Sequence, residues 1–94
     1  MWIYIIIYMD DETLKILGYV VSSTYRTEVM KTLIEKPKIP SKIAADIGIK
    51  QNHISNVLKE LKNKGLVDII NPEAKKGRYY RLTKMGEEIA EELN

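Results

Sequence analysis

The chain has 94 residues, no cysteine, one histidine and a formal net charge of +2. A chain of this length forms one domain with a modest core, and the absence of cysteine excludes a disulfide framework and a thiolate site. The single histidine, His53, makes a zinc site unexpected, because such a site needs about four N, S or O ligands.

The net charge is unevenly distributed. Residues 1–35 carry three basic and five acidic side chains, residues 36–84 carry twelve basic and four acidic ones, and residues 85–94 add four glutamates. A basic middle between two acidic ends is typical of a chain whose middle binds a polyanion. The alternative is a Lys-rich face that is merely solvated.

The chain opens on the apolar run "MWIYIIIY". The run is too short to cross a bilayer as a helix, which needs about 20 residues, and it lacks the basic region and cleavage site of a signal peptide. Its Trp, Ile and Tyr residues favour a strand that is apolar on both faces. We expect this strand to be buried in a homodimer. The alternative is an extension, because Met9 before the acidic cluster resembles a natural start.

Two helices are predicted next, over residues 11–21 and 24–35. The first has acids in its first turn, which complement the helix dipole, and the second can be capped by the "SST" stretch. The apolar stripe predicted for the second helix consists of Tyr25, Val29, Met30 and Leu33. The predicted dimer contacts, from the opening strand and the first helix, are Trp2, Tyr4, Ile5, Ile7, Leu14, Leu17 and Val21.

Two short helices follow the proline-containing stretch "KPKIPS". Ser41 is expected to cap the first of them, and Gly48 is expected to end it in the left-handed conformation. The small residues Ala44 and Ala45 would let it approach the second, residues 51–64, which Gly65 closes. This spacing is typical of a helix-turn-helix.

The second of these helices separates into two faces when residues are placed 100° apart. Its apolar face consists of Ile54, Val57, Leu58 and Leu61. Its polar face contains Asn52, Ser55, Asn56 and Lys59, although Asn and Ser are mediocre helix formers. Asn can form bidentate bonds to adenine, so this face suits a DNA major groove. An ordinary solvated helix face is the alternative.

A hairpin and a last helix complete the predicted elements. Strands are expected over residues 66–70 and 78–82, with Tyr79 and Tyr80 on opposite faces of the sheet. The turn between them, residues 71–78, carries basic residues that can reach a DNA backbone or minor groove, unless it is only a solvated loop. Thr83 should cap the last helix, whose inward residues are expected to be Met85, Ile89 and Leu93.

Three stretches carry a family resemblance: "YRTEVMKTL", "IPSKIAADIGIKQNHISNVLKELKNKGLV" and "GRYYRLTKMGEEI". From residue 25 to 93 the chain resembles winged-helix transcriptional regulators of the ArsR/MarR kind, especially small archaeal ones. The resemblance implies a cytoplasmic, homodimeric, double-stranded DNA-binding regulator. No Cys-containing metal motif is present, so metal sensing is not implied. The predicted DNA contacts are Ser41, Lys50, Gln51, Asn52, His53, Ser55, Asn56, Lys59, Lys75, Lys76, Arg78 and Arg81.

The predicted fold class is mainly α with a small β-hairpin, in which residues 1–22 serve dimerisation and residues 23–94 form the winged helix. No nucleophile–base set is present in the sequence, so neither an enzyme nor a cofactor is expected, and no membrane or metal partner. Two other functions stay open: a winged helix that binds proteins, and a non-specific chromosomal DNA-binding protein. The protein-binding module should expose large apolar groups where this chain has Asn, Ser and Lys.

Overall fold

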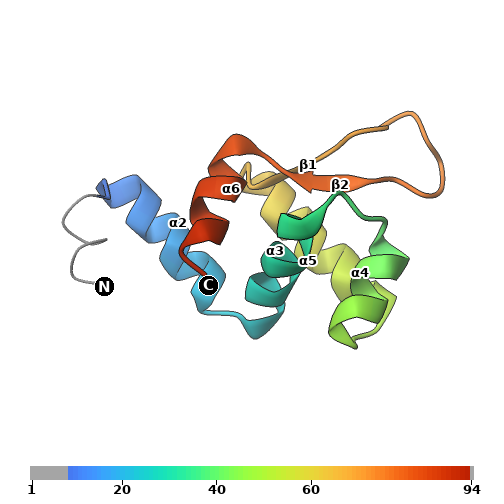
Figure 1. Ribbon diagram of the computed structural model, residues 1–94, viewed down its shortest axis with the longest axis horizontal. Helices are drawn as coiled ribbons and strands as arrows, with labels where there is room; N and C mark the ends of the chain where they lie inside the picture. Colours follow the sequence, from blue (N-terminus) through green and yellow to red (C-terminus); the bar gives the residue numbers. More distant parts are fainter. Residues whose placement is uncertain (1–8, 94) are drawn as a thin grey trace.

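Five helices and one antiparallel pair of strands make up residues 9–93, the part of the chain that the computed structural model describes (Figure 1). The elements are α2 (Asp11–Val21), α3 (Thr24–Glu35), α4 (Pro40–Ile47), α5 (Gln51–Asn63), β1 (Val67–Ile69), β2 (Tyr80–Leu82) and α6 (Lys84–Glu91). The mainly α class with a small hairpin is therefore confirmed. None of the helices in this part of the chain is long and apolar enough to span a membrane.

Helices α2 and α3 have the bounds predicted from the sequence, because a side-chain cap fixes the start of each. The Asp10 carboxylate accepts a hydrogen bond from the Thr13 backbone N–H at 2.7 Å. The Ser23 hydroxyl oxygen accepts one from the Arg26 N–H at 3.2 Å. Such caps satisfy backbone donors that the first helical turn leaves unpaired.

The buried residues of these two helices agree only in part with the apolar residues that the sequence singled out. In α2 the core residues are Leu17 and Val20, while Val21 is 46% exposed. In α3 the predicted Val29, Met30 and Leu33 are buried, but Tyr25 is 44% exposed. The prediction was wrong for Tyr25 because it lies in the first turn, at the end of the helix, whereas the exposure of Val21 leaves it available for the dimer contact predicted for it.

Helix α4 begins earlier than predicted, and Ser41 is not its cap. Ile39 takes the cap position without a side-chain hydrogen bond, and Pro40 is the first helical residue. Proline suits that position because its φ is already helical and its missing N–H has no partner there. Gly48 ends the helix as predicted, with φ +75°. Of the two predicted contact alanines only Ala44 is buried, whereas Ala45 is exposed.

The hairpin is shorter than predicted but has an additional partner. Val67 pairs with Leu82 and Ile69 with Tyr80 in antiparallel register. On its other side Tyr80 pairs with Lys38, through Lys38 N–H to Tyr80 O at 3.0 Å and Tyr80 N–H to Lys38 O at 2.9 Å. The segment between α3 and α4 therefore continues the sheet beside β2.

The cap residue of helix α6, Thr83, follows β2 and contacts the turn that ends α5. The Thr83 hydroxyl oxygen accepts from the Gly86 N–H and donates to the Gly65 carbonyl at 2.6 Å. Gly86 and Ile89 are buried, but Met85 is 41% exposed, so its predicted inward position was wrong. Leu93 packs partly buried against the core. The largest fully buried side chains come from all five of these helices and from the start of the hairpin: Val20, Val29, Met30, Ile43, Ile54, Leu58, Leu61, Leu66, Val67 and Ile89.

Candidate nucleic-acid interface

The polar face of α5 is fully accessible. Its predicted contacts are all exposed: Gln51, Asn52, His53, Ser55, Asn56 and Lys59. The opposite face, from Ile54 to Leu61, is buried in the core as predicted. The Ser55 hydroxyl donates to the Gln51 carbonyl at 3.2 Å, and both Asn52 and Asn56 are exposed. This face can therefore present two amide groups to an approaching surface.

The acidic residue of α5, Glu60, lies one turn after Asn56 and is already paired with a residue of α3. Glu60 accepts a hydrogen bond from Arg26 Nε at 3.4 Å. Arg26 is held in turn by α2, because its Nη1 donates to the Tyr19 carbonyl at 3.0 Å and its guanidinium lies 3.8 Å from the centre of the Tyr19 ring. The neighbouring charges on the exposed side are Lys50 and Lys59, so the local field there favours a polyanion.

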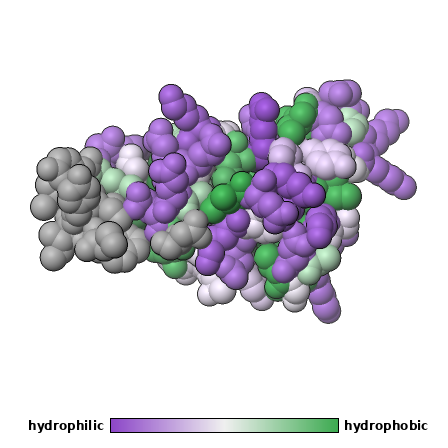
Figure 2. Space-filling view, viewed as in Figure 1, coloured by the Kyte–Doolittle hydropathy of each residue, from purple (hydrophilic) through white to green (hydrophobic). Residues whose placement is uncertain are grey.

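The loop between β1 and β2, residues 71–78, is closed by its own hydrogen bonds, and we refer to it as the wing. The Asn71 side chain accepts from the Tyr79 N–H at 2.8 Å and donates to the Gly77 carbonyl at 3.2 Å. Arg78 Nε donates to the Ala74 carbonyl at 2.7 Å. These contacts give the wing a defined shape, and Figure 2 shows hydrophilic side chains projecting from this end of the molecule.

Lysines occupy the tip of the wing, and tyrosines occupy its base. Lys75 and Lys76 are exposed. Tyr79 is 47% exposed, whereas Tyr80 packs partly buried against the core, so the two tyrosines lie on opposite faces as predicted. Arg81 is exposed but pairs with Asp68 on the neighbouring strand at 2.9 Å. Its charge is therefore partly neutralised, unlike the charges at the tip.

A buried lysine is the feature that the sequence did not reveal. Lys38 is 3% exposed, and its ammonium donates to Asp46 Oδ2 at 2.6 Å and to the Thr32 hydroxyl at 2.8 Å. Asp46 also accepts from Lys42 Nζ at 2.7 Å. The Lys42–Asp46 spacing of four residues is a recognisable helical pair, whereas no spacing in the sequence marks Lys38, whose ammonium lies between α3 and α4 and whose backbone pairs with Tyr80, far along the chain.

This cluster changes the ionisation of its members. The hydrogen bond from Lys38, followed by that from Lys42, holds the pKa of Asp46 well below its usual range. The hydrogen bond to Asp46 raises the pKa of Lys42. Glu35 lies 3.5 Å from the Lys38 ammonium and adds a second carboxylate to the cluster. The charged form of Asp46 is therefore stabilised by folding.

Stability should depend on pH through Asp46. Because the pKa in the folded protein lies below the unfolded value of about 3.9, its contribution is complete above about pH 4 and is lost as the pH falls through the folded pKa. We expect Asp46→Asn to lower the free energy of unfolding at pH 7 and the difference from the unmodified protein to shrink at about pH 3. Urea unfolding at both pH values measures this, and an equal difference at both would contradict it.

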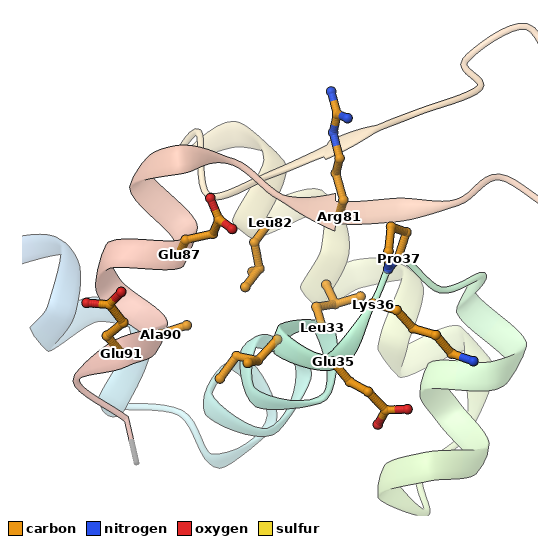
Figure 3. A pocket seen from close by; sticks show the side chains of 10 residues that line it. Leu33, Glu35, Lys36, Pro37, Arg81, Leu82, Glu87, Ala90 and Glu91 are labelled. Atoms are coloured by element: carbon orange, nitrogen blue, oxygen red, sulfur yellow. The ribbon is translucent and has the colours of Figure 1, made fainter.

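A hollow of about 430 Å³ lies between α3, β2 and α6, away from α5. Leu33, Leu82 and Ala90 form its apolar centre, and the charged ends of Lys36 and Arg81 point away from it (Figure 3). Within residues 9–93 there is no group of three or more His, Cys, Asp or Glu residues placed to hold a metal ion.

Only some of the predicted dimer contacts lie within the residues that the structure describes. Trp2, Tyr4, Ile5 and Ile7 lie outside the described residues. Leu17 is 3% exposed and belongs to the core of its own chain, so its predicted exposure to a partner was wrong. The same residue spacing that makes α2 amphipathic turns Leu17 towards the core. Of the two other predicted contacts on α2, Leu14 is partly buried and Val21 is exposed.

Comparison with known proteins agrees with this geometry. Residues 12–94 match the family described as the methanogenesis regulatory protein FilR1, N-terminal domain. No curated protein matches the chain. Similar solved structures include a MarR family transcription regulator, with 26% identity and a TM-score of 0.68 over 76% of this chain and 48% of that chain.

Two further structures have the same fold. The PcaV transcriptional regulator from Streptomyces coelicolor has 22% identity and a TM-score of 0.68, over 76% of this chain and 54% of that one. ZitR from Lactococcus lactis, solved in complex with DNA, has 19% identity and a TM-score of 0.69, over 76% of this chain and 49% of that one. The chain spans about half the length of these proteins. It has the winged-helix fold of MarR-type regulators and belongs to the family of the FilR1 N-terminal domain.

Proposed function

We propose that this chain is the double-stranded DNA-binding part of a transcription regulator, in which α5 enters the major groove and the wing contacts the backbone or the minor groove. The observation that carries the proposal is that the same domain has both an exposed, amide-rich face on α5 and a basic wing closed by its own hydrogen bonds. The structure of the similar protein ZitR in complex with DNA supports the proposal. The regulatory description of the family favours regulation over coating of chromosomal DNA.

The residue types divide the proposed contacts into two roles. Asn52 and Asn56, with Gln51 and Ser55 beside them, would contact base edges, because amide groups can pair bidentately with adenine. The remaining predicted contacts would bind phosphate, which positions the protein without reading sequence: Ser41, Lys50, His53, Lys59, Lys75, Lys76, Arg78 and Arg81.

We further propose a cytoplasmic, non-catalytic homodimer in which residues 1–22 serve dimerisation and residues 23–94 bind DNA. The exposed Val21 on α2 supports an apolar contact there. A two-fold dimer would present its two α5 helices one duplex turn apart, about 34–36 Å, to a roughly palindromic site. The alternative of a protein-binding module is disfavoured, because the exposed face of α5 carries Asn and Ser in place of large apolar groups.

Neutralising the wing tests its proposed phosphate contacts. Because each phosphate contact adds about 0.9 to the slope of log affinity against log salt, Lys75→Gln with Lys76→Gln should reduce that slope by about 1.8 for each protomer bound. Binding to preferred and random duplexes should weaken by the same factor. Fluorescence anisotropy titrations at several salt concentrations measure both quantities.

The matched control removes the same charge elsewhere. Lys31 of α3 and Lys84 of α6 are exposed lysines outside both the proposed DNA contacts and residues 1–22, so Lys31→Gln with Lys84→Gln should leave the salt slope nearly unchanged. An equal loss of slope in both double variants would mean that only net charge matters, and that the wing is not a contact surface.

A further inference from the structure

Lys38 connects three parts of the fold through one side chain. Its ammonium contacts Asp46 in the last turn of α4, at 2.6 Å, and Thr32 of α3, at 2.8 Å. Glu35, at the end of α3, lies 3.5 Å away. The three N–H donors of a lysine ammonium therefore have three acceptors within reach, and the side chain is only 2% exposed.

The backbone of the same residue holds the base of the wing. Its N–H and carbonyl both pair with Tyr80, at 3.0 and 2.9 Å. Tyr80 is the first residue of β2, the strand that the wing leads into. Asp46, at the other end of the connection, lies just before the Gly48 turn that leads into α5. One residue thus joins the base of the wing to the helix that sets the start of α5.

A charged residue at this place needs a reason other than stability. Removing an ammonium from water costs several kcal/mol, and apolar residues of similar volume often replace buried ion pairs without loss of stability. An apolar side chain would fill the same space but would not fix a direction between α4 and β2. Charged hydrogen bonds to oriented acceptors do fix one.

We propose that Lys38 is a positioning residue that holds the wing at a fixed orientation to α5, so that both reach one DNA duplex together. This rests on the proposed DNA-binding function for its purpose, but the fixed orientation itself is a property of the free protein. Pre-organising two contact surfaces lowers the cost of ordering them on binding. Without Lys38 the wing would keep its charge and lose much of its contribution to affinity.

A double-mutant cycle on DNA binding separates positioning from general stability. Lys75→Gln with Lys76→Gln should weaken binding of the unmodified protein by about tenfold or more at low salt. In a Lys38→Met background the same wing change should weaken binding by only about threefold or less. The matched control is Lys42→Met, because Lys42 contacts the same Asp46 at 2.7 Å but is exposed and does not pair with the wing. In that background the wing change should keep its full effect.

A distance measurement tests the orientation without DNA. The chain has no cysteine, so Lys59→Cys on α5 and Tyr79→Cys at the base of the wing can carry a pair of spin labels. Double electron–electron resonance measures the distance between the two labels. Its distribution should be narrow for the otherwise unmodified protein and for Lys42→Met, and broader for Lys38→Met. If Lys38→Met does not fold, Asp46→Asn removes the charged acceptor and should broaden the distribution in the same way.

The two measurements distinguish failure of this proposal from failure of the proposed function. Equal wing effects in all backgrounds, with unchanged distance distributions, would overturn the positioning role while leaving DNA binding intact. An absence of salt-dependent DNA binding by the unmodified protein would refute the proposed function, and the distance distributions alone would then decide whether Lys38 orients the wing.

Discussion

Replacing Asn52 and Asn56 with alanine is expected to remove most of the preference of the protein for its cognate duplex over a random one. Each good bidentate contact to a base contributes about 1–3 kcal/mol of discrimination, so the double variant should lose roughly 2–6 kcal/mol of it. Both side chains lie on the exposed face of α5, beside Ser55, whose hydroxyl donates to the Gln51 carbonyl. Affinity for random DNA should change little, because the phosphate contacts remain.

The measurement begins with selection of a preferred duplex from a random pool, followed by anisotropy titrations of that duplex and a scrambled one. Asn63→Ala is the matched control, because Asn63 is an exposed asparagine on the same helix whose side chain faces a hollow beside α2. It should retain full discrimination. If the double variant weakened binding to both duplexes equally, as the wing variant should, the division between base and phosphate contacts would be wrong.

Gly86→Ala is expected to lower the free energy of unfolding by about 3 kcal/mol, the size typical of overpacking against rigid backbone. An added Cβ would overlap the carbonyl oxygen of Leu66 and lie 3.3 Å from Leu82 Cβ. The carbonyl cannot simply move away, because it accepts the Thr83 N–H at 3.0 Å. For a domain of this size the melting temperature should fall by roughly 12 °C or more.

The control is another helical glycine with free space around it. Gly18 in α2 has no atom within 4 Å of an added Cβ, so Gly18→Ala should raise stability by up to about 1 kcal/mol through helix propensity. Thermal and urea unfolding of both variants at one protein concentration measure the difference. Equal stability of Gly86→Ala and the unmodified protein would show that α6 does not pack against Leu66 as closely as the structure indicates.

Helices were predictable where local chemistry determines their ends. Asp10 and Ser23 cap α2 and α3, and these residues set where both helices begin. At α4 the sequence offers two possible helix starts, Ser41 as a cap and Pro40 as the first helical residue. The structure has Pro40 as the first helical residue. The strands were predicted too long because residues 66–70 keep an apolar, β-branched character beyond the ladder, which ends at Ile69 paired with Tyr80.

The candidate site was predictable as far as it depends on one helix or one loop. The separation of α5 into an apolar and a polar face follows from its 100° spacing alone, and the structure places both faces as expected. The pairing of Arg81 with Asp68 and the burial of Lys38 depend on which strands lie side by side. Such contacts between distant segments leave no periodic signal, so the sequence showed only a basic residue at each place.

The most direct test of the account is the salt dependence of DNA binding by the unmodified protein. Fluorescence anisotropy with a mixed-sequence duplex, titrated at several salt concentrations, reports the number of phosphates that the protein neutralises. We expect binding at low salt that falls steeply as salt increases, because the exposed lysines of α5 and the wing would release counterions together. Absence of binding even at low salt would contradict the proposed DNA-binding function and favour a protein partner for the same face.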